Sequence, residues 1–451
     1  MMRYRITNSE ATSAPLAPQP DGLSFWMTTY FIVGNMAGAG VLVLPKALSD
    51  TGWGGIVFMT LCCAISMYSG VCLARCRIIL EERYEEFREK IRKPYPAIAQ
   101  QAYGTKMKYF VSICVEINFI GVSVVYLLLP AELIAKLLDD KIPFCGLILI
   151  LAAVLCPMMW FGTPKDFKFV AVIAFVTTIG AIIFLFVAMG QHAAKESLKP
   201  THNPPTFMSF FLSIGVILFA FGGTATFPTF QNDMINKKEF PAVMVVSFGA
   251  VYLVYSPVAL LGYYLYGDDV SIDITDTIPP SIFKSLILIL LTIRTIFAFV
   301  MIINASSQEF ESIFKVPDRF GWKRIAVRVS LLLFVLFIAV SIPRFGKVLT
   351  VVGASVITLT TSVFPFMFYY KLCSQSNSSW PDRKLPVYKK VILFLIMVFG
   401  VIGGSIATYL AAAEIVRDSG LSPPCYINTS ISARAKIFQS LNVLQNMEYY
   451  V

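Results

Sequence analysis

The chain has little charge, little histidine and no paired-cysteine motif. Only 14% of its 451 residues are charged, against about 25% in an ordinary soluble domain. Its two histidines, His192 and His202, fall in one polar loop, which argues against a membrane enzyme built on buried histidine or a histidine-bound metal. The nine cysteines include no Cys-x-x-Cys pair, so neither a disulfide framework nor a metal site is expected.

Apolar residues are abundant instead, at 57% of the chain. A soluble protein of this length could not hide that much apolar surface in one or two cores. We therefore expect an integral membrane protein in contact with the lipid bilayer. The net charge of +10 does not indicate nucleic-acid binding, because the basic residues lie between apolar runs.

Eleven apolar runs are long enough to cross the bilayer, which takes roughly 20 residues of helix. They are continuous rather than alternating, which favours helices over a β-barrel, so the expected fold class is an all-α membrane protein with eleven transmembrane helices. The runs cover approximately 24–46, 53–76, 108–136, 145–162, 167–190, 208–231, 240–266, 282–306, 325–342, 345–371 and 390–416. The predicted domains are a disordered cytoplasmic tail (1–23), a transmembrane domain (24–416) and an extracytoplasmic tail (417–451).

The distribution of Lys and Arg predicts a cytoplasmic N-terminus. With that orientation 25 of these residues lie on the inner side and 11 on the outer side, while Arg294 lies within a span, in agreement with the positive-inside rule. An odd number of spans then places the C-terminus outside the cell or in a lumen, and the choice between plasma membrane and endolysosomal or vesicular membrane stays open.

Two features of the predicted outer side depend on this orientation. The sequon at Asn428 is an expected glycosylation site. Cys145 and Cys425 are the only cysteines on that side. They either pair in an oxidising compartment or remain two free thiols.

The most informative pattern is an interruption in two of the runs. Residues 31–45 place three glycines and an asparagine in the middle of the first span, and residues 219–228 place two glycines in the sixth. In both, a Gly is followed after four residues by Pro, as Gly40–Pro45 and Gly223–Pro228. Small residues in one span often serve only close helix packing, but two equivalent interruptions in spans of opposite direction favour a five-plus-five inverted repeat with broken helices.

Broken helices at the depth of the bilayer indicate a binding site. Unwound backbone is tolerated there only where it lines a cavity. The N-terminus of a half-helix attracts a carboxylate, and its C-terminus attracts an ammonium group. A free amino acid carries both charges a few ångströms apart and fits such a pair of breaks.

Four motifs in order resemble the amino acid/auxin permease family, a branch of the amino acid–polyamine–organocation transporters. Gly38–Ala47 (GAGVLVLPKA) is similar to the family's G-x-G-[IV]-L-x-L-P-x-A, and residues 219–228 (FAFGGTATFP) are similar to F-A-F-x-G-x-x-x-F-P. Gly262–Gly267 (GYYLYG) looks like the end of its seventh span. Asn304–Glu311 (NASSQEFE) looks like N-P-x-x-Q-x-x-E at the end of its eighth, with Ala305 where proline is common.

This resemblance, over about residues 24–416, implies a LeuT-type core of two five-helix repeats with one helix added. It implies amino acid transport coupled to protons or sodium, with substrate carboxylate at Gly38–Gly40, ammonium near the carbonyls of Val33, Phe219 and Ala220, and the substrate side chain toward the third and eighth spans. The residues expected to contact substrate are Val33, Gly34, Asn35, Met36, Ala37, Gly38, Ala39, Gly40, Phe219, Ala220, Phe221, Gly222, Gly223 and Thr224.

Two ionisable residues fall deep within spans, Glu116 in the third and Arg294 in the eighth. Such residues are rare in membranes and usually functional. Our hypothesis is that they pair and tune coupling or substrate charge preference. The alternatives are a purely structural ion pair, or two residues that face different cavities and never meet.

The coupling ion has candidates of two kinds. In the LeuT-type core a sodium site would use Asn35 near the first break and Asn304, Ser306 and Ser307 of the eighth span, although the latter three would alternatively cap a helix end. A buried Glu116 would instead carry a proton, whereas an ion pair with Arg294 would hold it charged. We prefer the proton and expect no other cofactor.

The sequence thus predicts a secondary active transporter of small neutral amino acids that works by alternating access, with hinges at residues 34–40 and 222–223. The rival from another class is a receptor-like amino acid sensor that uses the same fold and site. No nucleophile–base or metal constellation supports an enzyme, and no catalytic residue is assigned. The sequence does not indicate an oligomeric state.

Overall fold

The computed structural model of the protein is built from helices. It describes residues 22–36, 38–139, 141–160, 167–195, 199–316, 321–377, 380–381, 383, 385–418 and 424–427. Most of the two predicted tails, and Asn428 with them, lie outside these residues. Within the described part, the only strand-like pairing is an isolated bridge between Leu23 and Met234.

Eight stretches are helical, long and apolar enough to cross a membrane. A helix satisfies most of its backbone hydrogen bonds internally, which is why helices can cross a bilayer. These stretches comprise α3 (Gly55–Arg83), α5 (Thr105–Leu137), α7 (Phe167–Lys195), α10 (Phe240–Tyr266), α12 (Ile282–Ile313), α13 (Trp322–Ser341), the run from α14 (Phe345–Val352) to α15 (Phe364–Ser374), and α16 (Val387–Asp418).

The remaining predicted spans are bent or short. Helices α1 (Phe25–Met36) and α2 (Ala39–Thr51) pass the same test only as a pair bent by 56°. Helices α6 (Phe144–Trp160) and α8 (Phe207–Ala220) are apolar but shorter. Each predicted run therefore holds helix, while the count of eleven crossings stays a prediction.

Short helices cover the ends of the bundle. They are η1 (Glu85–Phe87), α4 (Pro94–Tyr103), α9 (Phe227–Asn232), η3 (Lys237–Glu239), η4 (Gly267–Asp269) and α11 (Ile274–Thr277). Most of them lie in loops between the long helices, where Pro, Gly and charged residues interrupt the apolar runs.

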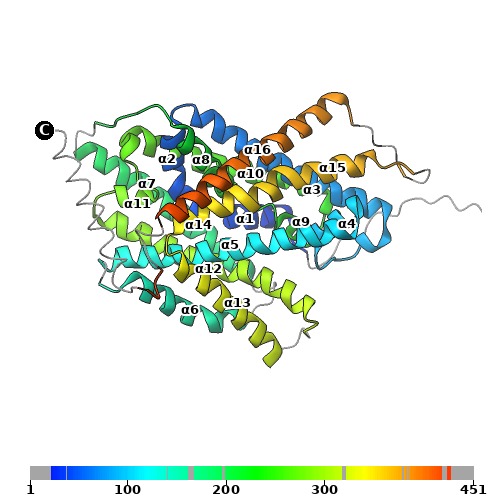
Figure 1. Ribbon diagram of the computed structural model, residues 1–451, viewed down its shortest axis with the longest axis horizontal. Helices are drawn as coiled ribbons and strands as arrows, with labels where there is room; N and C mark the ends of the chain where they lie inside the picture. The colour runs from blue at the N-terminus through cyan, green and yellow to red at the C-terminus, as the bar shows by residue number, and fades with distance from the viewer. Residues whose placement is uncertain are drawn as a thin grey trace, which may run out of the picture.

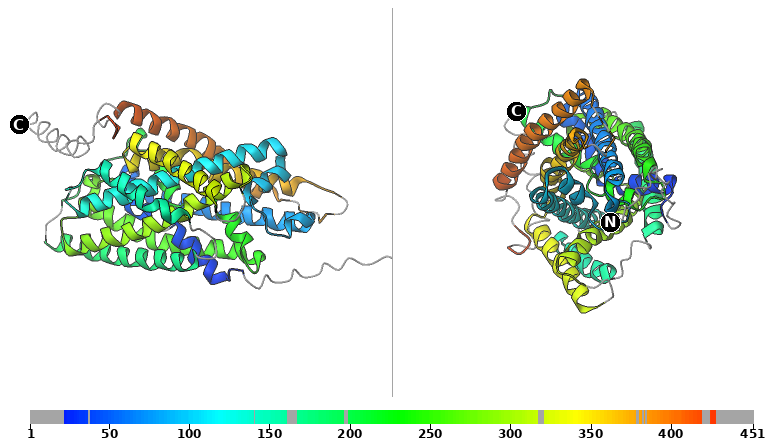
Figure 2. Two further views of the ribbon diagram at one scale, coloured as in Figure 1. Left: turned by 90° about the horizontal axis from the view of Figure 1, so that it is seen from below. Right: turned by 90° about the vertical axis from the view of Figure 1, so that its right-hand side faces the viewer.

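The long helices lie side by side along the longest axis of the molecule (Figure 1). Helix α5 packs along α12, and α12 packs on its other side against α7. Helices α6 and α13 pack together at one edge, and α16 lies at the opposite edge (Figures 1 and 2). The broken pair α1–α2 is held inside this frame by contacts of α1 with α7 and α10, and of α2 with α8 and α10.

The run from α14 to α15 contains two π-helical segments, η5 (Gly353–Ile357) and η6 (Leu359–Val363). The hydroxyl of Thr358 donates to the carbonyl of Gly353 at 2.8 Å, five residues back, so a side chain takes part in the wider turn. π-Helical segments are rare and frequently mark functional sites. A Cβ at Gly353 would lie 2.0 Å from the carbonyl oxygen of Gly215, so η5 and α8 touch backbone to backbone.

Ion pairs hold the predicted outer end of the bundle. Lys136 at the end of α5 is almost buried, and its Nζ lies 2.6 Å from Asp273, 3.0 Å from Asp276 and 3.1 Å from Glu132. The two aspartates belong to the segment around α11. The lysine therefore links this segment to α5 through ion pairs.

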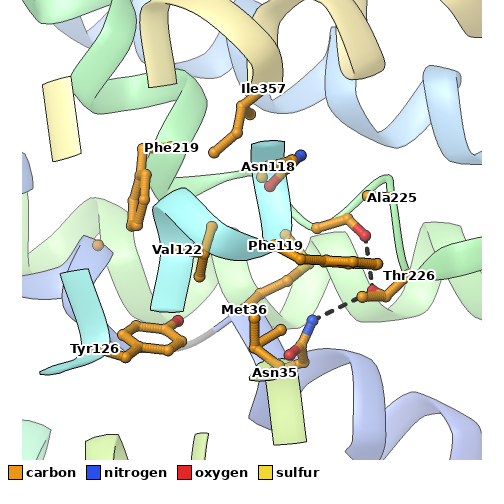
Figure 3. A pocket seen from close by; sticks show the side chains of 14 residues that line it. Asn35, Met36, Asn118, Phe119, Val122, Tyr126, Phe219, Ala225, Thr226 and Ile357 are labelled. Atoms are coloured by element: carbon orange, nitrogen blue, oxygen red, sulfur yellow. Dashed lines mark hydrogen bonds between the residues drawn. The ribbon is translucent and has the colours of Figure 1, made fainter. Parts of the chain in front are cut away.

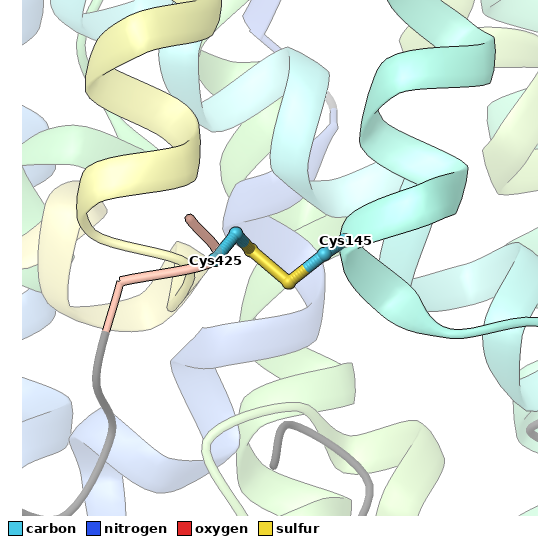
Figure 4. Close-up of a disulfide and its surroundings, with 2 residues drawn as sticks. All are labelled: Cys145 and Cys425. Atoms are coloured by element: carbon cyan, nitrogen blue, oxygen red, sulfur yellow. A yellow bond between two sulfur atoms is a disulfide. The ribbon is translucent and has the colours of Figure 1, made fainter. Parts of the chain in front are cut away.

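A disulfide joins the same end of the molecule to the C-terminal segment. Cys145 in the first turn of α6 is bonded to Cys425 (Figure 4). The backbone N–H of Cys425 also donates to the carbonyl of Val340 at 2.9 Å. Of the two states that the sequence left open for these cysteines, the structure shows the paired one.

Candidate functional site

The first span is broken, as predicted, but over a shorter stretch. Helix α1 ends at Met36 and α2 begins at Ala39, with Gly38 as its N-cap. Ala37 lies outside the described residues. Gly34 is therefore inside the last turn of α1 and Gly40 inside the first turn of α2, so the predicted hinge at 34–40 is narrower in the structure.

The sixth span is broken more widely. Helix α8 ends at Ala220, and α9 begins only at Phe227. Gly223 has a φ of +131°, a backbone conformation that is open to glycine and strained for other residues. Pro228 stands in the first turn of α9, where its missing N–H costs nothing.

The two breaks meet. A Cβ at Gly40 would lie 2.8 Å from the Cα of Ala220, so the start of α2 and the end of α8 approach backbone to backbone. On the other side, the Nδ2 of Asn35 donates to the hydroxyl of Thr226 at 3.4 Å (Figure 3). A positive half-helix end and a negative one thus lie side by side, as the inverted repeat predicts.

A cavity opens at this meeting point (Figure 3), with about 490 Å³ of space free of atoms when the solvent at its mouth is included. Among the described residues, none that line it carries a charged side chain. Its lining residues are Asn35, Met36, Gly40, Asn118, Phe119, Val122, Tyr126, Phe219, Gly222, Gly223, Ala225, Thr226, Ile302 and Ile357.

Only some of the residues predicted to contact substrate line the cavity. Asn35, Met36, Gly40, Phe219, Gly222 and Gly223 line it. The others that are described lie around it in the two broken helices: Val33, Gly34, Gly38, Ala39, Ala220, Phe221 and Thr224. The hydroxyl of Thr224, for example, lies 3.0 Å from that of Thr361 in η6 and joins the second break to the π-helical run.

Residues of the third span were missed as individuals, although the span itself was expected to face the substrate. Asn118, Phe119, Val122 and Tyr126 come from one face of α5, and the last three recur every three or four residues. That spacing is visible in the sequence, but any apolar span offers several such faces. Asn118 also donates to the hydroxyl of Thr360 at 3.3 Å.

Arg294 of α12 binds the end of α1. Its side chain is completely buried, and its Nη2 donates to the carbonyls of Gly34 at 3.0 Å and Asn35 at 3.4 Å. Its Nε donates to Thr178 on α7 at 3.2 Å. A Cβ at Gly38 would lie 1.9 Å from Nη1, so the guanidinium fills the space at the break.

Tyr255 of α10 completes this arrangement and was not predicted. Its hydroxyl donates to the carbonyl of Met36 at 2.7 Å and accepts from the N–H of Gly38 at 3.3 Å. The carbonyls of Gly34, Asn35 and Met36 all have internal donors. A positive group therefore already satisfies the negative end of α1.

The predicted pair of Glu116 and Arg294 is not formed, which corrects that hypothesis. Glu116 accepts a hydrogen bond from the hydroxyl of Ser306 at 2.6 Å, and the carboxyl of Glu309 lies next to it. Arg294 faces the break instead. The two residues lie at different depths: Glu116 is level with Ser306, twelve residues after Arg294 on α12 and so about 18 Å away along that helix.

The polar residues of the eighth span do not gather into one cation site with Asn35. Ser306 donates to Glu116, Ser307 donates to the carbonyl of Ile303 in its own helix at 2.7 Å, and Asn35 bonds Thr226 across the breaks. Asn304 is buried. Because α12 continues to Ile313, these residues do not cap its end, and the capping alternative was wrong.

Comparison with known proteins agrees with this geometry. A model of the family described as transmembrane amino acid transporter protein matches residues 21–410. The amino acid transporter AVT1C of Arabidopsis thaliana is 24% identical over 84% of this chain and 68% of its own length. The amino acid transporter AVT1J of the same plant is 23% identical over 91% and 96%.

Solved structures share the fold at low sequence identity. MhsT in complex with L-phenylalanine has a TM-score of 0.56 at 13% identity, over 87% of this chain and 100% of its own. A mutant of the manganese transporter of Eremococcus coleocola has a TM-score of 0.59 at 12% identity, over 96% of both chains. The resemblance that the four motifs indicated is thereby confirmed. The chain is a multi-pass membrane protein with the LeuT-type fold, and it belongs to the transmembrane amino acid transporter family, whose members carry out transport rather than catalysis.

Proposed function

We propose that the protein is a secondary active symporter that moves small neutral amino acids together with protons. The observation that carries this proposal is the cavity between two oppositely directed half-helix ends, which has no charged side chain among its described lining residues. The geometry matches the charge separation of a zwitterion, and the membership of the family supplies the activity class.

The carboxylate and the ammonium of the substrate are expected to bind the ends of two different half-helices. The carboxylate is expected at the first N–H groups of α2, near Gly38–Gly40, because helix N-termini attract anions. The ammonium is expected at the last carbonyls of α8, near Phe219 and Ala220. We assign it there rather than to Val33 because the positive guanidinium of Arg294 binds the neighbouring carbonyls of α1 and would repel an ammonium.

The lining favours small neutral substrates. Three glycines, Gly40, Gly222 and Gly223, form part of the wall, and their lack of a side chain leaves room next to the backbone. The wall from α5 is uncharged, with Phe119 and Val122 beside the polar Asn118 and Tyr126. A charged substrate side chain would be desolvated there without a partner, at a cost of several kcal/mol.

Two arguments favour protons over sodium. A sodium ion at the first break would need the carbonyls at the end of α1, and the guanidinium of Arg294 supplies a permanent positive charge at that place. Of the candidate sodium ligands of α12, Ser306 donates to Glu116 and Ser307 donates to the carbonyl of Ile303. A buried carboxylate, Glu116, is available for a proton.

The orientation belongs to the same proposal. The excess of basic residues on the side of α4 supports a cytoplasmic N-terminus, and the Cys145–Cys425 disulfide fits an oxidising compartment on the other side. Glycosylation at Asn428 stays a prediction from the sequence. The identity of the membrane and the oligomeric state stay open.

Uptake into proteoliposomes tests the proposal. We expect a labelled mixture of all neutral amino acids to accumulate when the outside is made acidic, and a sodium gradient alone to have no effect. Saturable binding without any flux would contradict transport and would favour the receptor-like sensor. A requirement for sodium would contradict coupling to protons.

A further inference from the structure

We propose that Glu116 and Glu309 form the site that binds the coupling proton, as a pair of carboxyl groups that share it between α5 and α12. This inference rests on the proposed function, since it names the place where the driving ion is bound. Glu309 follows the family motif's Gln308 and was not among the residues that the sequence indicated.

The two carboxyl groups are buried against each other. Glu116 and Glu309 are each 8% exposed. Glu116 accepts from Ser306, one turn before Glu309 on α12, and Glu309 accepts from Ser112, one turn before Glu116 on α5, so the two carboxyls lie next to each other. Ser306 donates to one oxygen of Glu116 at 2.6 Å, but no described group donates to the other oxygen, Oε1. A buried acceptor without a donor is costly. A proton on one of the two carboxyls supplies the missing donor.

The charges around the pair also call for one proton. Glu309 accepts a hydrogen bond from Ser112 of α5, and Lys93, just before α4, lies 3.0 Å from it. The charged groups that act on Glu116 are Glu309 and Lys93. Two carboxylates and one lysine leave a net negative charge in a desolvated place, and one added proton makes the cluster neutral.

Among the described residues, arginines of α12 and α13 near the pair bind other groups. Helix α13 also packs on α5 and α12, but its Arg324 and Arg328 bind Glu311, at 3.2 and 2.6 Å. Arg294, one of the two deep ionisable residues, is held at the end of α1. The proton is therefore the group that completes the cluster.

The position of the pair fits a coupling role. Glu116 lies one helical turn from Phe119, and Ser306 one turn from Ile302, and both Phe119 and Ile302 line the cavity. One turn is about 5 Å, so the pair lies just below the cavity on the side of α4. Lys93 is 23% exposed and connects the pair to the predicted cytoplasmic surface. A proton that leaves the pair thus has a short way to that surface.

The test separates coupling from substrate movement. Glu116→Gln and Glu309→Gln are reconstituted and compared in two assays with a labelled mixture of all neutral amino acids. The first assay is accumulation driven by an acidic exterior, and the second is exchange between labelled and unlabelled amino acids without a pH gradient. We expect each variant to lose at least about 90% of the driven accumulation and the accompanying acidification of the lumen, and to keep exchange within about threefold of the unmodified protein.

Glu82→Gln is the matched control, because Glu82 is a partly exposed carboxylate that pairs with Arg383 far from the cavity. It should change neither assay. Lys93→Met provides a second variant that leaves both carboxyls in place. Removing this positive charge makes proton binding to the pair easier, so half-maximal activation by external protons should move to higher pH.

Distinct outcomes overturn distinct claims. If the unmodified protein neither accumulates nor exchanges any amino acid, the proposed function fails. If it transports, but Glu116→Gln and Glu309→Gln retain accumulation driven by the pH gradient, the proton site is elsewhere. If both variants lose exchange as well as accumulation, or if Lys93→Met leaves the pH profile unchanged, the pair does not bind the coupling proton.

Discussion

Arg294 shows how one residue can determine the chemistry of a broken helix. A half-helix that ends inside a bilayer leaves carbonyls that need donors, and each one left bare costs several kcal/mol in hydrocarbon. Arg294 satisfies two of them from a neighbouring helix, and its guanidinium is anchored on the far side by Thr178. The break in α1 is therefore a stable element rather than an open gap.

Substitution of Arg294 should weaken both stability and transport. Arg294→Gln leaves the carbonyls of Gly34 and Asn35 without their donor, and we expect a loss of roughly 1–3 kcal/mol for each such group. Thermal unfolding in detergent measures this loss. Arg383→Gln, which removes an arginine from a partly exposed pair, should have almost no effect, and equal destabilisation by the two changes would contradict the assigned role.

Gly38 tests the same contact from the other side. In Gly38→Ala the new Cβ would lie 1.9 Å from the Nη1 of Arg294, so the guanidinium must move. We expect uptake to fall about tenfold or more, which matches an overpacking cost above about 1.4 kcal/mol. Gly54→Ala is the control, since nothing lies within 4 Å of its Cβ. Normal uptake by Gly38→Ala would show that the contact is dispensable.

At the scale of elements, the π-helical run between α14 and α15 supports the second break. Thr361 of η6 contacts Thr224 of the break, and Thr360 accepts from Asn118 of α5. Ile357 at the end of η5 lines the cavity itself. These three side chains are spaced i, i+3 and i+4, so they lie on one face of the run.

Close contact between η5 and α8 is required for this support. Gly353→Ala would place a Cβ 2.0 Å from the backbone oxygen of Gly215, and a backbone atom cannot swing aside as a side chain does. We expect the two elements to separate, with lower thermal stability and lower uptake. Gly249→Ala in α10, where nothing lies within 4 Å, should be neutral or slightly stabilising. Similar results for both changes would argue against the contact.

At the scale of the whole molecule, the segment around α11 is fastened to the frame by Lys136. Lys136→Met leaves Asp273, which is 1% exposed, without its counter-charge. Removing one partner of a buried pair typically costs about 3–5 kcal/mol. The expected drop in thermal stability should exceed that of Lys46→Met, whose partly exposed pair with Asp50 contributes about 0–1 kcal/mol. A larger drop for Lys46→Met would show that the ion pairs of Lys136 do not hold the α11 segment in place.

The architecture could be predicted from the sequence because its signals are local. Apolar runs define the helices, and the Gly-rich stretches before Pro45 and Pro228 define the breaks. The partners of Glu116 and Arg294 could not be predicted, because helices α5 and α12 extend beyond the apolar runs from which depth was counted. The two residues therefore lie at different depths. Tyr255 was missed because one tyrosine among many gives no sign that it faces a break.

The absence of charged side chains from the described lining of the cavity has an electrical consequence. Under the proposed symport of a zwitterion with protons, the substrate brings no net charge into the membrane, so any current recorded during uptake counts only the protons. One proton per cycle moves one elementary charge, and the membrane voltage then adds about 2.3 kcal/mol per 100 mV to the force on each substrate molecule. Recording charge and labelled substrate together would thus give their ratio directly.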